Sequence, residues 1–178
     1  NPCRRAVFKA MDCARKSGVR ISFDPTLRVD IWNSVSTLRG IYDRALRLSD
    51  IVIFSEEESE FLFGTSKPEE AARRAMKYGA GIVGIKLGKK GSYITSKDGK
   101  TFQTPAFKVK AVDTTGAGDG WNAGLLAGLC KDWDLHKCAI VANAIGALVV
   151  TKRGAITALP RKEELAAFLK SNEFDLEI

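Results

Sequence analysis

The residues best suited to chemistry form the segment Asp113-Thr114-Thr115-Gly116-Ala117-Gly118-Asp119. Gly116, Ala117 and Gly118 carry little or no side chain, so their backbone N–H groups can converge on an anion, and a helix start adds positive potential there. Such a hole suits the negative charge on a transferring phosphoryl group. Asp119 follows at once, where a carboxylate can accept the proton of an attacking hydroxyl. The segment therefore predicts a phosphoryl-transfer site.

Other interpretations of the same glycines have to be weighed against this prediction. No Gly-Lys-Ser or Gly-Lys-Thr follows them, so the segment is not a Walker loop. The spacing of the third glycine does not match the dinucleotide fingerprint, which argues against an oxidoreductase. A purely structural interpretation is that Asp119 only caps its helix and that the glycines only permit tight packing.

The elements around this segment predict an α/β fold. A strand at 107–112 precedes it, and a long helix from about residue 119 to 130 follows it. Two further strands, 50–54 (DIVIF) and 81–87 (GIVGIKL), are continuously apolar, which indicates a mostly parallel sheet with helices on both faces. Ligands of such sheets bind beyond the carboxyl ends of the strands, where the phosphoryl-transfer segment falls.

The other elements are predicted from caps, turn residues and apolar periodicity. Asp98-Gly99 between two alternating runs predicts a hairpin, and Ser66 with Glu69 predicts a capping box around Pro68. Asn1 is expected to cap the first helix, which Gly18 ends. The remaining predicted elements are a strand at 20–23 and helices at 34–47, 56–63, 66–78, 135–150 and 162–170.

Four candidate residues lie outside the phosphoryl-transfer segment, and each has a structural alternative. Glu58 ends the run Glu56-Glu57-Glu58 at a helix start, where it either complements the helix dipole or binds metal. Arg28 follows a strand end and is interpreted as facing a ligand rather than as a plain surface arginine. Lys86 either contacts a phosphate or extends its charged end into solvent. Asn143 is either a satisfied core amide or a neighbour of adenine.

Composition narrows the function classes further. The net charge of +7 comes from scattered residues rather than a basic stripe with aromatics, which favours an anionic small ligand over nucleic acid. The longest apolar stretch, 139–150, is shorter than the roughly 20 residues that cross a bilayer, so no membrane association is expected. The four cysteines form no CxxC pair and His136 is the single histidine, which argues against zinc and predicts reduced thiols in a cytoplasmic protein.

At these residues the chain resembles the PfkB, or ribokinase-like, family of carbohydrate kinases. Segment 113–119 followed by Asn122-Ala123-Gly124 is similar to the family's C-terminal signature. The run from Phe23 to Arg28 resembles fructokinase and 2-keto-3-deoxygluconate kinase members, although Thr26 stands where an asparagine is frequent. The resemblance implies a ribokinase-like three-layer sandwich. Residues 1–178 would be the C-terminal nucleotide-binding and catalytic part of a single domain whose N-terminal part and lid are absent.

The resemblance also implies roles for individual residues. Asp119 would be the general base, and Gly116 to Gly118 the anion hole, with ATP as the phosphoryl donor. Asp119 and Arg28 would both contact the sugar substrate, and in keto-deoxy-acid kinases an arginine at this position can face the substrate carboxylate. The residues that the resemblance places near the nucleotide are Ser55, Lys86, Gly88, Gly91, Asn143 and Gly146.

Two cation sites are implied in the same way. Glu58, in a segment similar to the family's Asn-x-x-Glu motif, would act on Mg²⁺ through water, although Ser55 replaces the motif's asparagine. A monovalent cation such as K⁺ would lie beside Asp113 and Thr115, with backbone help near Gly154.

The resulting hypothesis is an ATP-dependent kinase of a sugar or sugar acid, of the 2-keto-3-deoxygluconate or fructose type. Two alternatives stay open: a non-catalytic nucleotide-binding or scaffold member of the same fold, and a nucleoside kinase of the family. In relatives the N-terminal half grips most of the sugar and supplies the lid and often the dimer contact. We therefore expect the 178-residue chain to be inactive, or nearly so, by itself, with any homodimer forming through the missing lid.

Overall fold

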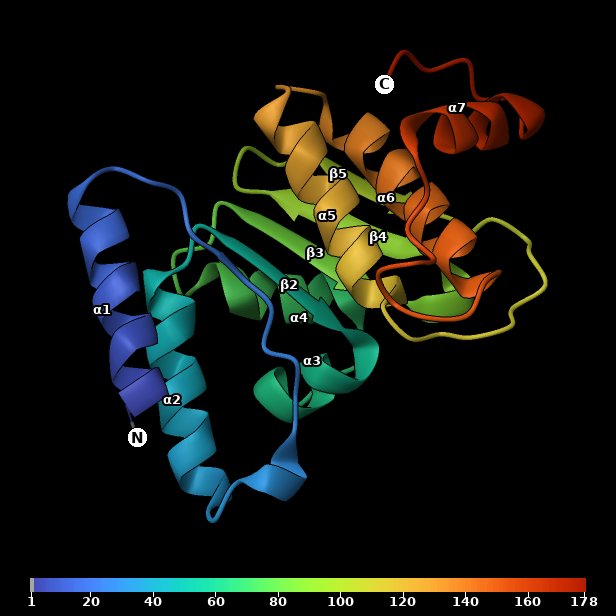
Figure 1. Cartoon of the computed structure of the whole chain (residues 1–178). Helices are drawn as coiled ribbons and strands as arrows, with labels where there is room; N and C mark the ends of the chain where they lie inside the picture. The colour runs from blue at the N-terminus through green and yellow to red at the C-terminus, as the bar shows by residue number, and fades with distance from the viewer. Residues whose placement is uncertain (1) are drawn as a thin grey trace. The chain divides into compact units, whose positions relative to one another are not determined.

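The computed structural model describes residues 2–178, and the chain divides into two compact units. Unit 1 consists of residues 1–86 with 95–101, and unit 2 of residues 87–94 with 102–178. The predicted cap Asn1 lies outside the described residues. The elements drawn in Figure 1 are α1 (Pro2–Lys16), β1 (Ser22–Phe23), η1 (Val29–Ile31), α2 (Val35–Leu48), β2 (Ile51–Ser55), α3 (Glu56–Phe63), α4 (Pro68–Met76), β3 (Ile82–Lys86), η2 (Gly88–Lys90), β4 (Ser92–Ser96), β5 (Thr101–Thr104), α5 (Ala117–Cys130), α6 (Leu135–Val150) and α7 (Lys162–Ser171).

The sheet confirms the α/β prediction. Its five strands follow the order β1-β2-β3-β4-β5, and β1, β2 and β3 are parallel. Ser22 of β1 opposes Ile51 of β2, which opposes Ile82 of β3. β2 is buried from Ile51 to Phe54, as expected of a parallel strand covered on both faces. The connection from β4 to β5 is too short for the crossover that parallel strands need, so these strands form the predicted hairpin.

In unit 1, α1 and α2 lie side by side (Figure 1) and share a small core. Phe8 and Met11 of α1 pack with Ala45 of α2. Phe23 of β1 and the preceding Ile21 pack against this cluster. α2 begins as predicted, because the side chain of its N-cap Ser34 accepts a hydrogen bond from a backbone N–H in the first turn.

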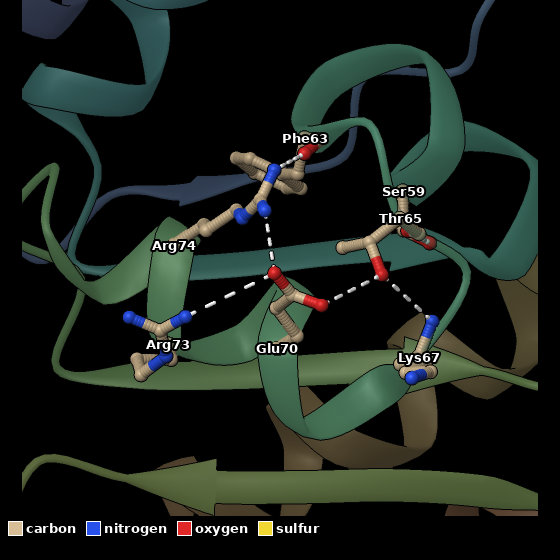
Figure 2. A network of polar contacts seen from close by, with 7 residues as sticks. All are labelled: Ser59, Phe63, Thr65, Lys67, Glu70, Arg73 and Arg74. Atoms are coloured by element: carbon tan, nitrogen blue, oxygen red, sulfur yellow. Dashed lines mark hydrogen bonds and ion pairs between the residues drawn. The ribbon is translucent and has the colours of Figure 1, made fainter.

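A polar network centred on Glu70 holds the turn between α3 and α4 (Figure 2). One Glu70 oxygen is 3.3 Å from Thr65 Oγ1, and the other pairs with Arg74, which also donates to the Phe63 carbonyl. Arg73 reaches the same carboxylate at 3.9 Å. The Arg74 hydrogen bond is the main reason that the pKa of Glu70 lies below its ordinary value. The network fixes α4 by charged contacts formed within one short stretch of chain.

The capping box predicted at Ser66 and Glu69 is wrong. Lys67 is the N-cap of α4 and makes no side-chain cap hydrogen bond, while Pro68 is the first helical residue. Proline restricts the residue before it to extended conformations, so the helix start shifts to Lys67. The N–H of Lys67 instead donates to Thr65 Oγ1 at 3.2 Å.

In unit 2, α5 and α6 pack closely and α7 covers part of α6. A Cβ at Gly124 of α5 would lie 2.9 Å from the Ala142 Cα of α6, so the missing side chain permits the close approach. α6 starts at its N-cap Asp134, whose side chain accepts from the Lys137 N–H. The core that α6 and α7 share consists of Ile140, Val141, Ala144, Leu148, Leu165 and Leu169.

The strand predicted at 107–112 is wrong. This segment has no regular structure, although Phe107 packs against Phe168 and Phe174 as an inward-facing residue would. Alternating apolar and lysine residues imitate a strand, but the N–H groups of Val112 and Asp113 both donate to the carbonyl of Val150, at 2.7 and 3.2 Å. The backbone before the phosphoryl-transfer segment is therefore tied to the end of α6.

Three expectations from composition can be compared with the structure. The apolar stretch 139–150 belongs to α6, and within residues 2–178 no helix has the length and apolarity needed to span a membrane. The same part of the chain brings together no group of three or more His, Cys, Asp or Glu side chains that could hold a metal. The four cysteines are free, and burial raises the pKa of the Cys138 thiol to about 11.

Candidate active site

The N-terminus of α5 carries the glycine-rich part of the predicted phosphoryl-transfer segment. Gly116 is the N-cap, with φ 79°, and a Cβ there would lie 2.8 Å from both Cα and Cβ of Ala155. Only glycine fits this position. Among the described residues, the N–H groups of Gly118 and Asp119 donate to no backbone carbonyl, as expected in a first helical turn. The N–H of Ala117 is less available, because it donates to the Thr114 carbonyl at 3.2 Å.

Asp119 is the third residue of α5 and its side chain is exposed. The interpretation that it only caps the helix does not hold, because the N-cap is Gly116 and no side chain caps α5. Within residues 2–178 its carboxylate takes part in no hydrogen bond or ion pair. A free carboxylate in the first turn, beside free N–H groups, is placed to accept a proton from whatever those groups bind.

Asp113 closes the loop before α5. One of its carboxylate oxygens accepts from the Thr115 N–H at 2.9 Å and the other from the Gly154 N–H at 3.0 Å. These hydrogen bonds, with that from Gly154 first, lower the pKa of Asp113 to about 2. Gly154 has φ 92°, and a Cβ there would meet Thr157 Oγ1 at 2.5 Å. The Asp113 carboxylate thus brings Thr115 and Gly154 together.

The candidate nucleotide residues of unit 2 divide into core and loop positions. Asn143 is 6% exposed; its Oδ1 accepts from Trp121 Nε1 at 2.8 Å, and its Nδ2 donates to the carbonyls of Thr104 and Pro105 at 3.1 and 3.0 Å. The side chain is therefore a satisfied core amide with no donor left for a nucleotide. Gly146 lies against α5, where a Cβ would come 3.6 Å from the Ala117 carbonyl oxygen.

Gly88 and Gly91 flank η2 and serve different purposes. Gly88 has φ 56° with open space where a Cβ would be. Gly91 has φ 100°, and a Cβ there would lie 2.0 Å from the Thr104 carbonyl oxygen. The Gly91 carbonyl also accepts from the Leu87 N–H at 2.8 Å, which closes the loop on itself. Gly91 is therefore required by packing, whereas the surroundings of Gly88 leave room for a ligand.

In unit 1, Ser55 and Glu58 form a capping box at the start of α3. Ser55 Oγ accepts from the Glu58 N–H at 3.1 Å, and Glu58 Oε2 accepts from the Ser55 N–H at 2.7 Å. The other carboxylate oxygen, Oε1, accepts from the Leu27 N–H at 2.8 Å. Glu58 is only 9% exposed. Each carboxylate oxygen thus accepts one backbone hydrogen bond, which leaves a second lone pair on each.

Lys86 and Arg28 differ in how they are held. Lys86 Nζ is 2.6 Å from Asp24 Oδ2, and the two side chains are 17% and 19% exposed. The lysine thus neither extends freely into solvent nor offers an uncompensated charge. Arg28 is exposed at the N-cap of η1 and makes no side-chain cap hydrogen bond.

Sequence reasoning missed three residues of this region. Asp24 binds Lys86, Thr26 has a left-handed backbone with φ 42°, and the Tyr42 hydroxyl donates to the Pro25 carbonyl at 2.9 Å. One signal was available: the carboxyl ends of parallel strands share one edge, so an aspartate after β1 and a lysine ending β3 were candidates for a pair. Nothing local in the sequence indicated Tyr42.

Comparison with known proteins places this arrangement in a family. The arrangement combines an α/β fold with a glycine-rich segment and an exposed carboxylate at one helix start. The family model described as pfkB family carbohydrate kinase matches residues 2–162. The chain belongs to this family.

Individual relatives agree with the family match. The chain is 38% identical to a fructokinase of Klebsiella pneumoniae over 171 residues, which cover 92% of this chain and 55% of that protein. It is 35% identical to the 2-dehydro-3-deoxygluconokinase of Bacillus subtilis (strain 168), covering 92% of this chain and 51% of the relative. The chain therefore spans about half the length of the curated relatives it matches.

A solved structure confirms the ribokinase-like fold class. A double mutant of the fructokinase from Vibrio cholerae O395, in fructose, ADP and potassium ion bound form, superposes with a TM-score of 0.86. The two proteins are 37% identical, and the match covers 95% of this chain and 56% of the fructokinase.

Proposed function

We propose that the protein transfers the γ-phosphoryl group of ATP to a hydroxyl of a sugar or sugar acid. The observation that carries this proposal is the free Asp119 carboxylate beside the unpaired N–H groups at the start of α5. Family membership supports it, as do the relatives named for fructose and for 2-dehydro-3-deoxygluconate.

In the proposed reaction, the acceptor hydroxyl oxygen forms a bond to the γ-phosphorus while the bond from that phosphorus to the bridging oxygen of ATP breaks. The hydroxyl proton passes to an Asp119 oxygen, and ADP carries away the electron pair of the broken bond. The N–H groups of Gly118 and Asp119 stabilise negative charge on the transferring group. Phosphoryl transfer depends mainly on such positioning and charge stabilisation.

We propose two cations for the reaction, a monovalent cation and magnesium, and different residues support each of them. Asp113, ionised and joined to Thr115 and Gly154, suits the neighbourhood of a monovalent cation, and the potassium-bound relative agrees with that use. Magnesium, when bound with the phosphates of ATP, would offset their charge. Glu58, whose carboxylate oxygens each keep a lone pair beside the backbone hydrogen bond, would act on this ion through water.

The substrate class follows from Arg28 and from the relatives. An exposed arginine on a loop after β1 suits a carboxylate or a hydroxyl-rich acceptor. The proposed acceptors are therefore a ketose of the fructose type and a keto-deoxy sugar acid, as in the names of the relatives. A panel of fructose, 2-keto-3-deoxygluconate, ribose and a nucleoside would rank them.

The test is Asp119→Asn in the active enzyme, compared with Asp132→Asn at the exposed end of α5. We expect Asp119→Asn to lower kcat by at least about 10³-fold while ATP binding, measured by calorimetry, changes little. Asp132→Asn should leave kcat unchanged. Near-normal turnover of Asp119→Asn would rule out the proposed base and with it the proposed mechanism.

A further inference from the structure

We propose that Tyr42, Glu58 and Lys86 are positioning residues that together pin the loop Asp24–Arg28 at the end of β1 in a substrate-binding conformation. This inference rests on the proposed function, because it concerns how the acceptor is held. It gives Lys86 and Glu58 a part in holding the acceptor loop.

Each of the three side chains comes from a different element and reaches a different residue of the loop. The Tyr42 hydroxyl, from α2, donates to the Pro25 carbonyl at 2.9 Å. Glu58 Oε1, from α3, accepts from the Leu27 N–H at 2.8 Å. Lys86 Nζ, at the end of β3, donates to Asp24 Oδ2 at 2.6 Å. The loop is thus tied at three successive points.

The loop has an unusual backbone that these ties can maintain. Thr26, between the tied residues, has φ 42°, a left-handed conformation that β-branched residues rarely adopt. Its N–H donates to Asp24 Oδ1 at 3.1 Å, so the aspartate that binds Lys86 also closes the turn. Unfavourable backbone conformations persist where surrounding contacts over-determine them, and they concentrate at ligand-binding positions.

Burial and charge support the assignment of these three side chains to the loop. Tyr42 and Glu58 are 7% and 9% exposed, and Lys86 is 17% exposed at its side chain. Burial, followed by the negative charges of Glu58 and Asp24, raises the pKa of Tyr42, so its hydroxyl stays a donor. Since Asp24 already compensates the charge of Lys86, the lysine is a poor ligand for an additional phosphate.

The consequence for recognition lies at the end of the loop. Arg28 is exposed directly after the pinned residues and lacks a side-chain cap contact. A guanidinium recognises a carboxylate or a diol through paired hydrogen bonds, which require a fixed backbone. Loosening the loop should therefore weaken acceptor binding and leave nucleotide binding unchanged.

The test compares variants of the pins with matched controls in the active enzyme. Lys86→Met is paired with Lys97→Met, and Glu58→Gln with Glu57→Gln, because Lys97 and Glu57 are exposed residues of the same unit. We expect the KM of the acceptor to rise about tenfold or more in both pin variants, with the KM of ATP in Lys86→Met changed less than about twofold. The control variants should match the wild type.

Hydrogen exchange provides a readout that does not depend on turnover. In Glu58→Ala, exchange of the Leu27 amide should accelerate by about tenfold or more, because this variant removes the carboxylate oxygen that accepts from it. If a pin variant fails to fold, Tyr42→Phe removes a single hydroxyl and should show the same kinetic pattern in weaker form.

The outcomes separate this inference from the proposed function. A raised KM for ATP with an unchanged acceptor KM in Lys86→Met would overturn the inference, as would unchanged Leu27 exchange in Glu58→Ala. If the full-length wild-type protein phosphorylates no acceptor of the panel, the proposed function fails, while the exchange rates still decide whether the loop is pinned.

Discussion

The loop at 24–28 in unit 1 is held by the side chains of Tyr42, Glu58 and Lys86, whereas the segment 113–119 in unit 2 is shaped mainly by positions that lack side chains. The first loop contains a strained threonine, and the second uses a glycine for its left-handed residue. The contrast shows two ways to fix a backbone for ligand binding. One adds contacts around an unfavourable conformation, and the other removes the atoms that would make it unfavourable.

Gly116→Ala would break the arrangement in unit 2 and should have the largest effect. The new Cβ would lie 2.8 Å from Ala155 at a φ of 79°, so both a clash and backbone strain oppose it. We expect a loss of about 2–4 kcal/mol in unfolding free energy, measured by urea denaturation. Gly88→Ala is the control, with φ 56° and open space, and should cost about 1 kcal/mol. Equal losses in the two variants would contradict the clash.

Lys86→Met would loosen the loop at 24–28 in unit 1, because it removes the ammonium group that pairs with the largely buried Asp24. We expect the free energy of unfolding to fall by about 1–3 kcal/mol. This is less than the cost of breaking a fully buried pair, because the two side chains are still 17% and 19% exposed. The exposed pair Lys100–Asp98, at 66% and 54%, is the control, and Lys100→Met should cost less than about 0.5 kcal/mol. A double-mutant cycle with Asp24→Asn measures the coupling, and additive losses would mean that the pair is not coupled.

Thr26→Asn sharpens the comparison by relieving strain without removing a pin. Asparagine tolerates a left-handed backbone better than a β-branched residue does. The free energy of unfolding of the variant, measured by thermal denaturation, should therefore be about 0.5–1 kcal/mol higher than that of the wild type. A loss of stability would show that the threonine is not strained at its φ of 42°.

Asp113 is the side-chain pin of unit 2, and acid should release it. Its pKa is lowered from 3.8 to about 2 by the hydrogen bonds from Gly154 and Thr115. A depressed folded-state pKa gives stability that is present above the unfolded value of 3.8 and is lost as the pH falls through about 2. The stability difference between wild type and Asp113→Asn should therefore shrink across this window. A constant difference from pH 6 to pH 2 would argue against the ionised contact. This is the smallest of the expected effects.

Local patterns in the sequence predicted much of the fold. Continuous apolar runs gave β2 and β3, and the glycines before Asp119 indicated the helix start that α5 provides. Two predictions from local patterns were wrong. The alternation of apolar residues and lysines at 107–112 resembled a strand, and Pro68 shifted the start of α4 away from the predicted cap.

The pins could not be predicted in the same way, because they join distant positions. The contacts of Leu27 with Glu58 and of Asp24 with Lys86 span 31 and 62 residues. The pattern Ser-x-x-Glu at Ser55 was a readable capping box, but the acidic run around it favoured an interpretation as dipole or metal-binding charge. Which side chain faces which backbone group depends on tertiary packing.

The two hydrogen bonds of Glu58 also predict how related chains should differ from this one. Both partners are backbone N–H groups, at Ser55 and Leu27, so any residue except proline can supply them. The residue type at position 27 can then vary among homologues. Position 58 should remain glutamate, because aspartate is too short and glutamine offers a single acceptor oxygen. Homologous sequences should therefore show an invariant acid whose partner position appears variable in every alignment yet never contains proline.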